Sequence, residues 1–425
     1  MASSILDDLK PWERRALLEF RSRLEESILT NQLFRPQHHH EKSKARVANA
    51  CYPEECDANE DDPKAVSLWG IPLLPSLGHE GTDVILFKFL QARDLRVSDA
   101  LDMLQRALRW RREHRVDGIL EEDVGFPELS NSTAYMDGVD KDGHPVCYNV
   151  YGVFKDKDLY RESFGNEEGR ERFVRWRVQF MEKGIKELSF KPGGVGSMLQ
   201  IIDLKDSLSH SMELRATTKK LVSILQDNYP EFVAKNIFLN VSFRSYAYHS
   251  LFSHFVSARS RSKFIFARPG KVTETLLKFI APEDLPIQYG GFKRVDDNEF
   301  SPENGRVSEI VIKGGTVEKI VIPTVQPGVT MVWDVAVVGW DVSYKEEFVP
   351  DDEGSYRVLI REEKKLDEPL RNSFYISEPG KVVLTIENRS FKKKKILYRS
   401  KSKPTVPVYN LLNKTADRCH TQRSC

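Results

Sequence analysis

The sequence predicts a multidomain protein in which a helical N-terminal part precedes an α/β domain, and an all-β sandwich follows. The chain has 425 residues, more than one ordinary hydrophobic core accommodates. Strand and helix patterns alternate between residues 133 and 267, which is typical of an α/β domain with a parallel sheet. After Asp296 the pattern changes to short β-rich runs separated by Gly-Gly and Pro-Gly turns.

The composition is that of a folded protein, with 40% hydrophobic, 30% charged and 10% aromatic residues. The net charge is only +1, so any attraction to phosphate or anionic lipid must come from local clusters. We find no signal peptide and no apolar run long enough to span a bilayer. Five cysteines, few and odd in number, favour a reducing compartment, and we expect a cytoplasmic protein.

The first 60 residues are predicted to form an arm, made of one amphipathic helix within residues 1–34 and a mobile linker. The apolar residues of this helix are Leu17, Leu18, Phe20, Leu24 and Ile28. The linker contains three histidines and two cysteines, whose spacing matches no standard zinc site, so we expect no metal: His38, His39, His40, Cys51 and Cys56.

Residues 61–123 are predicted to form a small helical subdomain, with helices at 85–97 and 99–117. The α/β domain is expected over residues 124–295. It begins with a hairpin at 133–152 around an Asp142-Gly143 turn. The remaining elements are a helix at 167–188, a strand at 197–204, a helix at 213–228, a strand at 236–241, a helix at 246–256 and a strand at 263–267. Right-handed crossovers between these strands imply a parallel sheet.

Residues 296–402 are predicted to form a β-sandwich, and residues 403–425 a frayed tail. The β-rich runs of the sandwich lie at 309–323, 329–344, 356–360 and 381–390.

The sequence contains none of the common catalytic or nucleotide-binding motifs. Its Gly-rich run, Gly193 to Gly196, precedes a strand, whereas a phosphate-binding loop links a strand to a helix. The G-x-S-x-G, Walker and H-E-x-x-H patterns are absent. We therefore expect a protein that is not an enzyme, has no catalytic residues or cofactor, and does not bind nucleic acid.

The helix predicted at 246–256 has an apolar surface broader than one stripe, which either packs on the sheet or covers an apolar ligand. Its apolar residues are Tyr246, Tyr248, Leu251, Phe252 and Phe255. Five basic residues follow without an intervening acid: Arg259, Arg261, Lys263, Arg268 and Lys271. They form either a solvated basic segment or a site for an anionic headgroup. Lys263 begins an apolar strand, where an unpaired ammonium is unfavourable, so we expect it to have an anionic partner.

Several strings in this region resemble the CRAL-TRIO lipid-transfer domain and its N-terminal helical subdomain, in the order and spacing of that family. They are FLQARDLRV with RWRREH, IIDLKD, NYPEFVAKNIFLNV and APEDLPIQYGG. The C-terminal strings VWDVAVVGWDVSYKEEFVP, NSFYIS and KKKKILYR resemble a GOLD domain. The combination is typical of the plant patellins, and it implies a CRAL-TRIO domain followed by a GOLD sandwich.

The resemblance implies a set of ligand-binding residues. Glu231 and Lys263 match positions that hold an inositol phosphate, Ser260 matches a neighbouring phosphate position, and Arg93 matches a basic residue of the helical subdomain. The apolar gate and pocket are assigned to Tyr248, Leu251, Phe252 and Phe255.

The chain also departs from the family pattern. Asp94 and Phe232 stand where phosphatidylinositol-transfer members often have Lys and Arg. Met198 and Gln200 replace the small hydroxyl residues of phosphatidylcholine binders. The resemblance therefore favours a phosphoinositide over a choline lipid.

The resemblance implies a non-enzymatic protein that carries or presents phosphoinositides, or a similar hydrophobic ligand, in membrane trafficking such as cell-plate formation during cytokinesis. We expect reversible, peripheral docking on anionic membranes through Lys392, Lys393, Lys394 and Lys395, although such a run also protects a sheet edge. The alternative function is a lipid-sensing adaptor that recruits a protein partner through its GOLD domain without transferring lipid.

Overall fold

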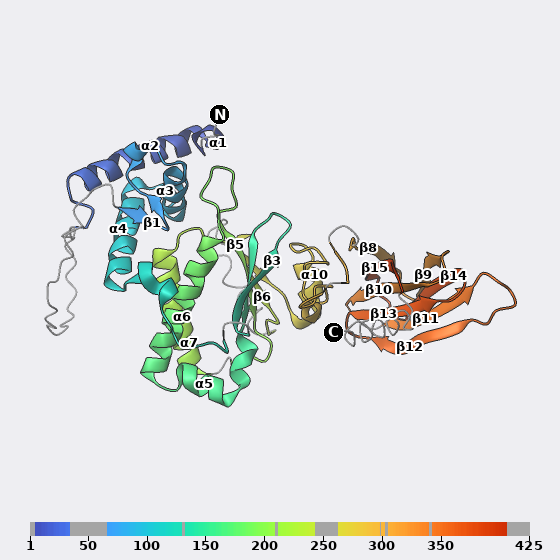
Figure 1. Cartoon of the computed structure of the whole chain (residues 1–425). Helices are drawn as coiled ribbons and strands as arrows, with labels where there is room; N and C mark the ends of the chain where they lie inside the picture. Colours follow the sequence, from blue (N-terminus) through green and yellow to red (C-terminus); the bar gives the residue numbers. More distant parts are fainter. Residues whose placement is uncertain are drawn as a thin grey trace, which may run out of the picture. The chain divides into compact units, whose positions relative to one another are not determined.

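The computed structural model describes residues 5–34, 66–129, 132–208, 211–242, 262–297, 299–301, 305–339 and 342–405. The chain divides into two compact units, Met1–Phe266 and Ala267–Cys425. The first unit contains a helical subdomain and an α/β domain, and the second contains a β-sandwich (Figure 1). Short 3-10 helices occur at Pro75–Leu77, Val116–Glu121, Tyr151–Lys155, Pro269–Lys271 and Ile287–Tyr289.

The helical subdomain is built from helices α1 to α4 and a two-stranded ribbon. The elements are α1 (Ile5–Asp8), α2 (Pro11–Leu29), β1 (Ser67–Leu68), β2 (Ile71–Pro72), α3 (Glu80–Ala92) and α4 (Val97–Glu113). Leu17 and Phe20 of α2 are fully buried in one hydrophobic core with Phe89 of α3 and Leu104 of α4. Helix α2 therefore packs with α3 and α4, although the sequence suggested a separate arm.

Two details refine the predicted N-terminal part. Leu18, expected on the apolar face of α2, is 49% exposed. An ion pair of 2.6 Å between Arg21 of α2 and Asp83 of α3 adds a polar contact between these helices. The predicted linker, with its histidines and cysteines, lies outside the described residues.

The α/β domain contains a five-stranded sheet with the strand order β3-β4-β5-β6-β7. The strands are β3 (Ala134–Val139), β4 (Pro145–Val150), β5 (Met198–Asp203), β6 (Val233–Leu239) and β7 (Phe264–Phe266). Strands β3 and β4 are antiparallel, and the remaining pairs are parallel. The predicted hairpin and parallel sheet are thus confirmed. Gly143 in the hairpin turn has a φ of 86°, a left-handed conformation that is unfavourable for residues with a side chain.

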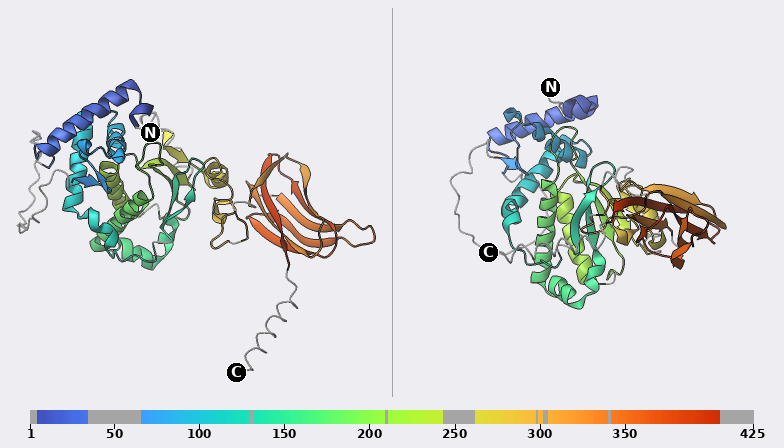
Figure 2. Two further views of the ribbon diagram at one scale, coloured as in Figure 1. Left: turned by 45° about the horizontal axis from the view of Figure 1, so that its top comes forward. Right: turned by 45° about the vertical axis from the view of Figure 1, so that its right-hand side comes forward.

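Helices α5 (Lys157–Phe164), α6 (Glu167–Lys186) and α7 (Met212–Asn228) lie on one face of this sheet (Figures 1 and 2). The Asn166 side chain caps α6 by accepting the backbone N–H of Gly169 at 2.7 Å. Apolar residues of α6, including Val178 and Met181, pack against Met198 of β5. The helix predicted at 246–256 lies outside the described residues.

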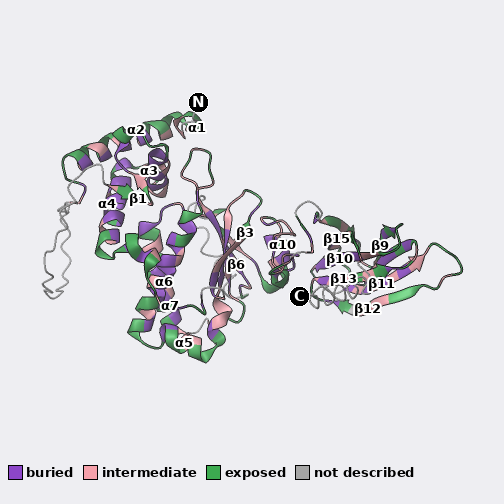
Figure 3. Cartoon of the chain, in the orientation of Figure 1, coloured by how far each residue is buried: buried purple, intermediate pink, exposed green. Residues whose placement is uncertain are grey.

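The second unit contains two antiparallel four-stranded sheets, ordered β13-β10-β15-β8 and β12-β11-β14-β9. Their strands are β8 (Ser308–Ile312), β9 (Thr316–Thr324), β10 (Val329–Val338), β11 (Val342–Pro350), β12 (Val358–Leu366), β13 (Leu370–Ile376), β14 (Gly380–Asn388) and β15 (Lys394–Pro404). Trp333, Tyr344 and Phe348 fill the core between the sheets, and Figure 3 colours such buried positions purple. The predicted sandwich is confirmed, and β15 extends one residue beyond the predicted start of the tail at 403.

A short segment that includes α10 (Val272–Leu276) precedes the sandwich within the second unit. Phe292 of this segment is fully buried against Ala336 and Leu397. The compact unit therefore begins at Ala267, earlier than the residue 296 suggested by the change in sequence pattern.

A buried carboxylate fixes this segment to the sandwich. Asp334 of β10 is fully buried and forms ion pairs with Arg294 at 3.1 Å, Arg371 at 2.8 Å and Arg399 at 2.7 Å. Arg371 also binds Asp297 at 2.7 Å, and its guanidinium lowers the pKa of that carboxyl to about 2. Three cations from three different segments thus share one buried carboxylate.

We predict that Asp334→Ala destabilises the second unit by about 3–5 kcal/mol, because it removes the buried anion that pairs with Arg294 and with the buried Arg399. Denaturant unfolding measures the change. Glu353→Ala, which removes an exposed carboxylate from the β11–β12 loop, is the control and changes stability little. Equal stabilities of the two variants would contradict this account.

Candidate functional site

The N-terminal ends of β5, β6 and β7 meet at one edge of the sheet, because the three strands are parallel. Glu231 precedes β6 and Lys263 precedes β7. Their side chains form an ion pair of 2.7 Å between Nζ and Oε2, with exposed side-chain fractions of 26% for Lys263 and 19% for Glu231. The structure therefore brings together the two residues predicted to hold a headgroup, and the anionic partner of Lys263 is Glu231.

Glu231 stands in a tight connection between α7 and β6. Its backbone φ is +56°, in the left-handed region that disfavours a side chain by roughly 1–2 kcal/mol. The Lys88 ammonium donates to the Glu231 carbonyl at 3.0 Å and to the Gly196 carbonyl, in front of β5, at 2.6 Å. Lys88 thus supports the strained connection that presents the Glu231 carboxylate.

Lys88 was missed in the sequence analysis, although it is a single lysine within an apolar helical run. Lys88 lies on α3 and is 8% exposed. Burial lowers its pKa from 10.5 to about 8; nearby Glu231 opposes this decrease and nearby Lys263 adds to it. The ammonium lies 4.6 Å from the ring centroid of Phe232, the residue after Glu231.

The three side chains form a cluster with more positive than negative charge. Two ammonium groups, those of Lys88 and Lys263, surround the single carboxylate of Glu231. An anionic group that reaches this edge gains attraction to both cations and reduces their mutual repulsion.

Of the other predicted headgroup and gate residues, the structure describes only Arg93, which does not join this cluster. Arg93 ends α3, and its guanidinium donates to the carbonyl of Ala92 at 3.1 Å; within the described ranges it forms no ion pair. Ser260 and the predicted gate residues Tyr248, Leu251, Phe252 and Phe255 lie outside the described residues.

A cavity of about 550 Å³ lies on the sheet face covered by α6 and α7. This volume falls in the usual range of small-molecule sites. Its apolar lining consists of Ile202, Leu204, Leu208, Leu214, Leu221, Val222, Leu225 and Phe238. Gln200 also lines the cavity, whereas Met198 on the same strand packs in the core beneath α6.

The predicted membrane-docking lysines lie at the β14–β15 connection of the second unit. Lys392 and Lys393 are exposed, whereas Lys394 donates to the Gly339 carbonyl at 2.8 Å and Lys395 pairs with Glu309 at 2.8 Å. The four lysines line a groove of about 630 Å³ together with residues of the α10 segment. Phe391, immediately before them, is fully exposed.

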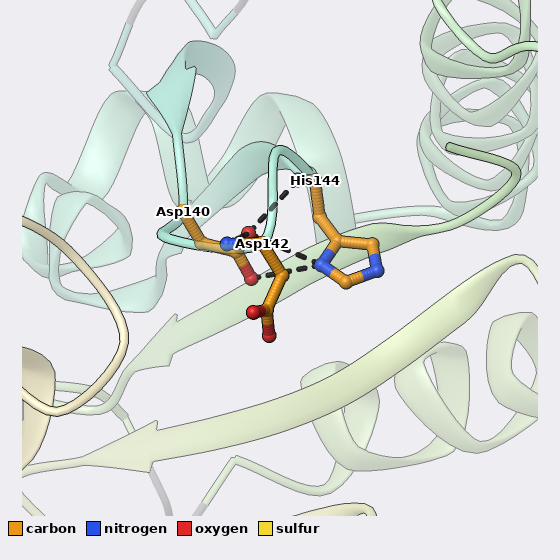
Figure 4. Close-up of side chains that lie close together, drawn as sticks. All are labelled: Asp140, Asp142 and His144. Carbon is orange, nitrogen blue, oxygen red and sulfur yellow. Dashed lines mark hydrogen bonds and ion pairs between the residues drawn. The ribbon is translucent and has the colours of Figure 1, made fainter. Parts of the chain in front are cut away.

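Asp140, Asp142 and His144 form a group with the residue types of a metal site in the β3–β4 turn (Figure 4). The Asp140 carboxylate accepts the backbone N–H groups of Asp142 at 2.9 Å and His144 at 2.8 Å. These bonds are those of an aspartate that stabilises a turn, so the group is explained by the hairpin.

Comparisons with known proteins agree with this architecture. The CRAL/TRIO N-terminal domain family matches residues 16–106, the CRAL/TRIO domain family matches 129–291, and the Patellin-1-like C-terminal GOLD domain family matches 313–394. Patellin-6 of Arabidopsis thaliana is 48% identical over 336 residues, which cover 78% of this chain and 81% of that protein. The chain belongs to the patellin family.

Other relatives vary in how much of them the chain spans. Patellin-4 of Arabidopsis thaliana is 53% identical over 351 residues, and the match covers 82% of this patellin-family chain but 63% of Patellin-4. The phosphatidylinositol transfer protein sfh-5 of Neurospora crassa is 30% identical over 249 residues, covering 53% of the chain and 66% of that protein.

Among the helices that the structure describes, none has the length and apolar character needed to cross a membrane.

We predict that Lys88 makes the stability of the first unit depend on pH. The unfolded chain keeps this proton up to pH 10.5, whereas the folded chain releases it near pH 8. The unfolded state therefore binds more protons between these values, so the free energy of unfolding rises with pH, by about 3 kcal/mol over the window. Denaturant unfolding of the wild type and Lys88→Met at several pH values measures the difference.

The exposed Lys183→Met serves as the control, and its pH profile follows the wild type. A Lys88→Met profile parallel to the wild type would show that the ammonium is not desolvated.

Proposed function

We propose that the chain binds a phosphoinositide and transfers it between membranes without covalent chemistry. The observation that carries this proposal is the Lys263–Glu231 pair beside Lys88, at the edge of a sheet whose face forms an apolar cavity. The ammonium groups suit the phosphate, and the carboxylate accepts hydrogen bonds from the inositol hydroxyls. The name of the Neurospora relative, a phosphatidylinositol transfer protein, supports the same ligand.

Affinity and selectivity arise from different parts of this site. Each acyl CH₂ group that leaves water contributes about 0.8 kcal/mol, so the chains supply most of the binding free energy. The charged cluster distinguishes headgroups, because an uncharged or cationic group leaves the net positive charge of Lys88, Lys263 and Glu231 uncompensated.

The β14–β15 loop is proposed as the membrane-docking element. The buried Asn388 side chain donates to the carbonyls of Lys313 at 3.0 Å and Lys392 at 2.9 Å, so the loop has a fixed form. It presents the exposed Phe391 ring beside Lys392 and Lys393. An aromatic ring with adjacent ammonium groups suits the interface of an anionic leaflet. In the cell, family membership supports a role in membrane trafficking, including cell-plate formation.

We predict that Lys263→Ala lowers phosphoinositide binding about 10-fold or more, because it removes a charged hydrogen bond from the headgroup. Mass spectrometry of co-purified lipid and transfer of labelled phosphatidylinositol between vesicles measure the effect. The exposed Lys183→Ala is the control. Unchanged binding by Lys263→Ala would refute the headgroup assignment, and binding without transfer would favour the lipid-sensing adaptor.

We predict that Phe391→Ala weakens binding to vesicles that contain phosphatidylserine, since ring insertion contributes about 1.5–3 kcal/mol. Replacing Lys392 and Lys393 by Ala removes roughly 1 kcal/mol each and reduces the salt dependence. Vesicle co-sedimentation measures both effects. Tyr356→Ala, which removes an aromatic ring 92% exposed in the β11–β12 loop, is the matched control. Equal vesicle binding by Phe391→Ala and Tyr356→Ala would place the docking surface elsewhere.

A further inference from the structure

A second charged position lies inside the cavity, on α6. Arg177 is 8% exposed and lines the cavity wall. Its guanidinium donates one hydrogen bond to the side-chain oxygen of Asn149 on β4, and it lies 5.3 Å from the ring centroid of Phe180. Its Nε–H is buried and has no hydrogen-bond partner.

Arg177 differs from a comparable buried arginine of the same unit. Arg111 binds the carboxylates of Glu182 and Asp117, so its charge is compensated within the protein. Across the described residues, no carboxylate lies within ion-pair distance of Arg177, and its side-chain acceptor is a neutral amide. Aromatic rings attract a cation, but a ring face is a much weaker hydrogen-bond acceptor than an oxyanion. A desolvated guanidinium with an unused donor is unfavourable unless a ligand completes it.

The cavity lining has the same sign of charge. Arg177, Arg215 and Lys219 contribute to its wall, and the lining contains no Asp or Glu. Arg215 and Lys219 are exposed on α7, so they stand at the solvent side, whereas Arg177 lies at the buried side. The remainder of the wall is uncharged, and most of it consists of apolar side chains, chiefly of β5, α7 and β6. This combination suits an apolar chain that ends in an anion.

Arg177 is separate from the headgroup edge. The Phe232 carbonyl, next to Glu231, accepts the N–H of Met198 at the start of β5, whereas Asn149 pairs with Ile202 four residues along that strand. At about 3.3 Å per residue, roughly 13 Å of sheet lies between the two positions. One phosphate group cannot bind both.

We propose that the cavity holds a second anion-binding position in which the Arg177 guanidinium binds the oxyanion of an amphiphile, in the first place the carboxylate of a long-chain fatty acid. The free Nε–H and an Nη–H form two parallel hydrogen bonds to the two carboxylate oxygens. The acyl chain lies along the face of β5 and β6 under α7. The proposal extends the proposed function, because it uses the same cavity but a different polar group.

Binding of oleate to the delipidated full-length protein tests the proposal. Arg177→Met lowers oleate affinity about 10-fold or more, the effect of one lost charged hydrogen bond, whereas Arg177→Lys retains most of it. Methyl oleate, which has no charge, binds more weakly than oleate to the wild type and equally to wild type and Arg177→Met. Lys183→Ala, at an exposed position of the same helix, leaves oleate binding unchanged.

Asn149→Asp keeps the test decisive if Arg177→Met does not fold. The new carboxylate loses the hydrogen bond that the Asn149 amide donates to the Ile201 carbonyl at 3.2 Å but gains an ion pair with Arg177, so this variant folds and loses oleate affinity about 10-fold. Oleate affinities that are equal in wild type, Arg177→Met and Asn149→Asp, or equal for oleate and methyl oleate, overturn the proposal.

The two proposals fail separately. Loss of phosphatidylinositol transfer in Lys263→Ala together with Arg177-independent oleate binding rejects only the second position. Arg177-dependent oleate binding by a protein that transfers no phosphatidylinositol rejects only the proposed function. If Arg177→Met lowers phosphatidylinositol transfer but the wild type does not bind oleate, the oxyanion belongs to a phospholipid and the fatty-acid assignment is overturned.

Discussion

One buried ammonium joins three parts of the first unit. Lys88 belongs to the helical subdomain, and its acceptors lie in front of β5 and β6 in the α/β domain. A desolvated charge is tolerated only when its hydrogen bonds are made, so the position of α3 and the shape of the sheet edge depend on each other. Since α3 packs in one core with α2 and α4, the geometry of the Glu231 connection rests on the whole helical subdomain.

Local patterns predicted most of the fold, because strand alternation, helix periodicity and turn residues act over a few positions. The pair Glu231 and Lys263 was found through family motifs. Lys88 was not, because its acceptors are 108 and 143 residues away in the sequence. Arg177 lies at helical spacing from Phe173, Val174 and Met181, on the apolar stripe of α6, but only the folded sheet shows the cavity beside it. Strand β13 was not predicted from strand alternation, because its interior residues are partly or fully exposed and only its two end residues are buried.

Two buried charges of the chain, Asp334 and Arg177, have opposite surroundings. Asp334 is surrounded by three arginines, and nothing about it requires a further partner. The Arg177 guanidinium contacts a neutral amide and two aromatic rings, and its Nε–H group has no hydrogen-bond partner. A compensated buried charge stabilises one packing arrangement, whereas an uncompensated one beside a cavity is a position prepared for a molecule that the protein does not itself contain.

The packing of α2 bears on how shortened forms of the protein behave. Leu17, Phe20, Leu24 and Ile28 cover apolar residues of α3 and α4. A chain that begins at residue 66 therefore exposes a contiguous hydrophobic surface, which favours self-association and non-specific binding to bilayers. Adhesion of such a fragment to vesicles reflects the uncovered interior of the helical subdomain, and it says nothing about the loop that carries Phe391.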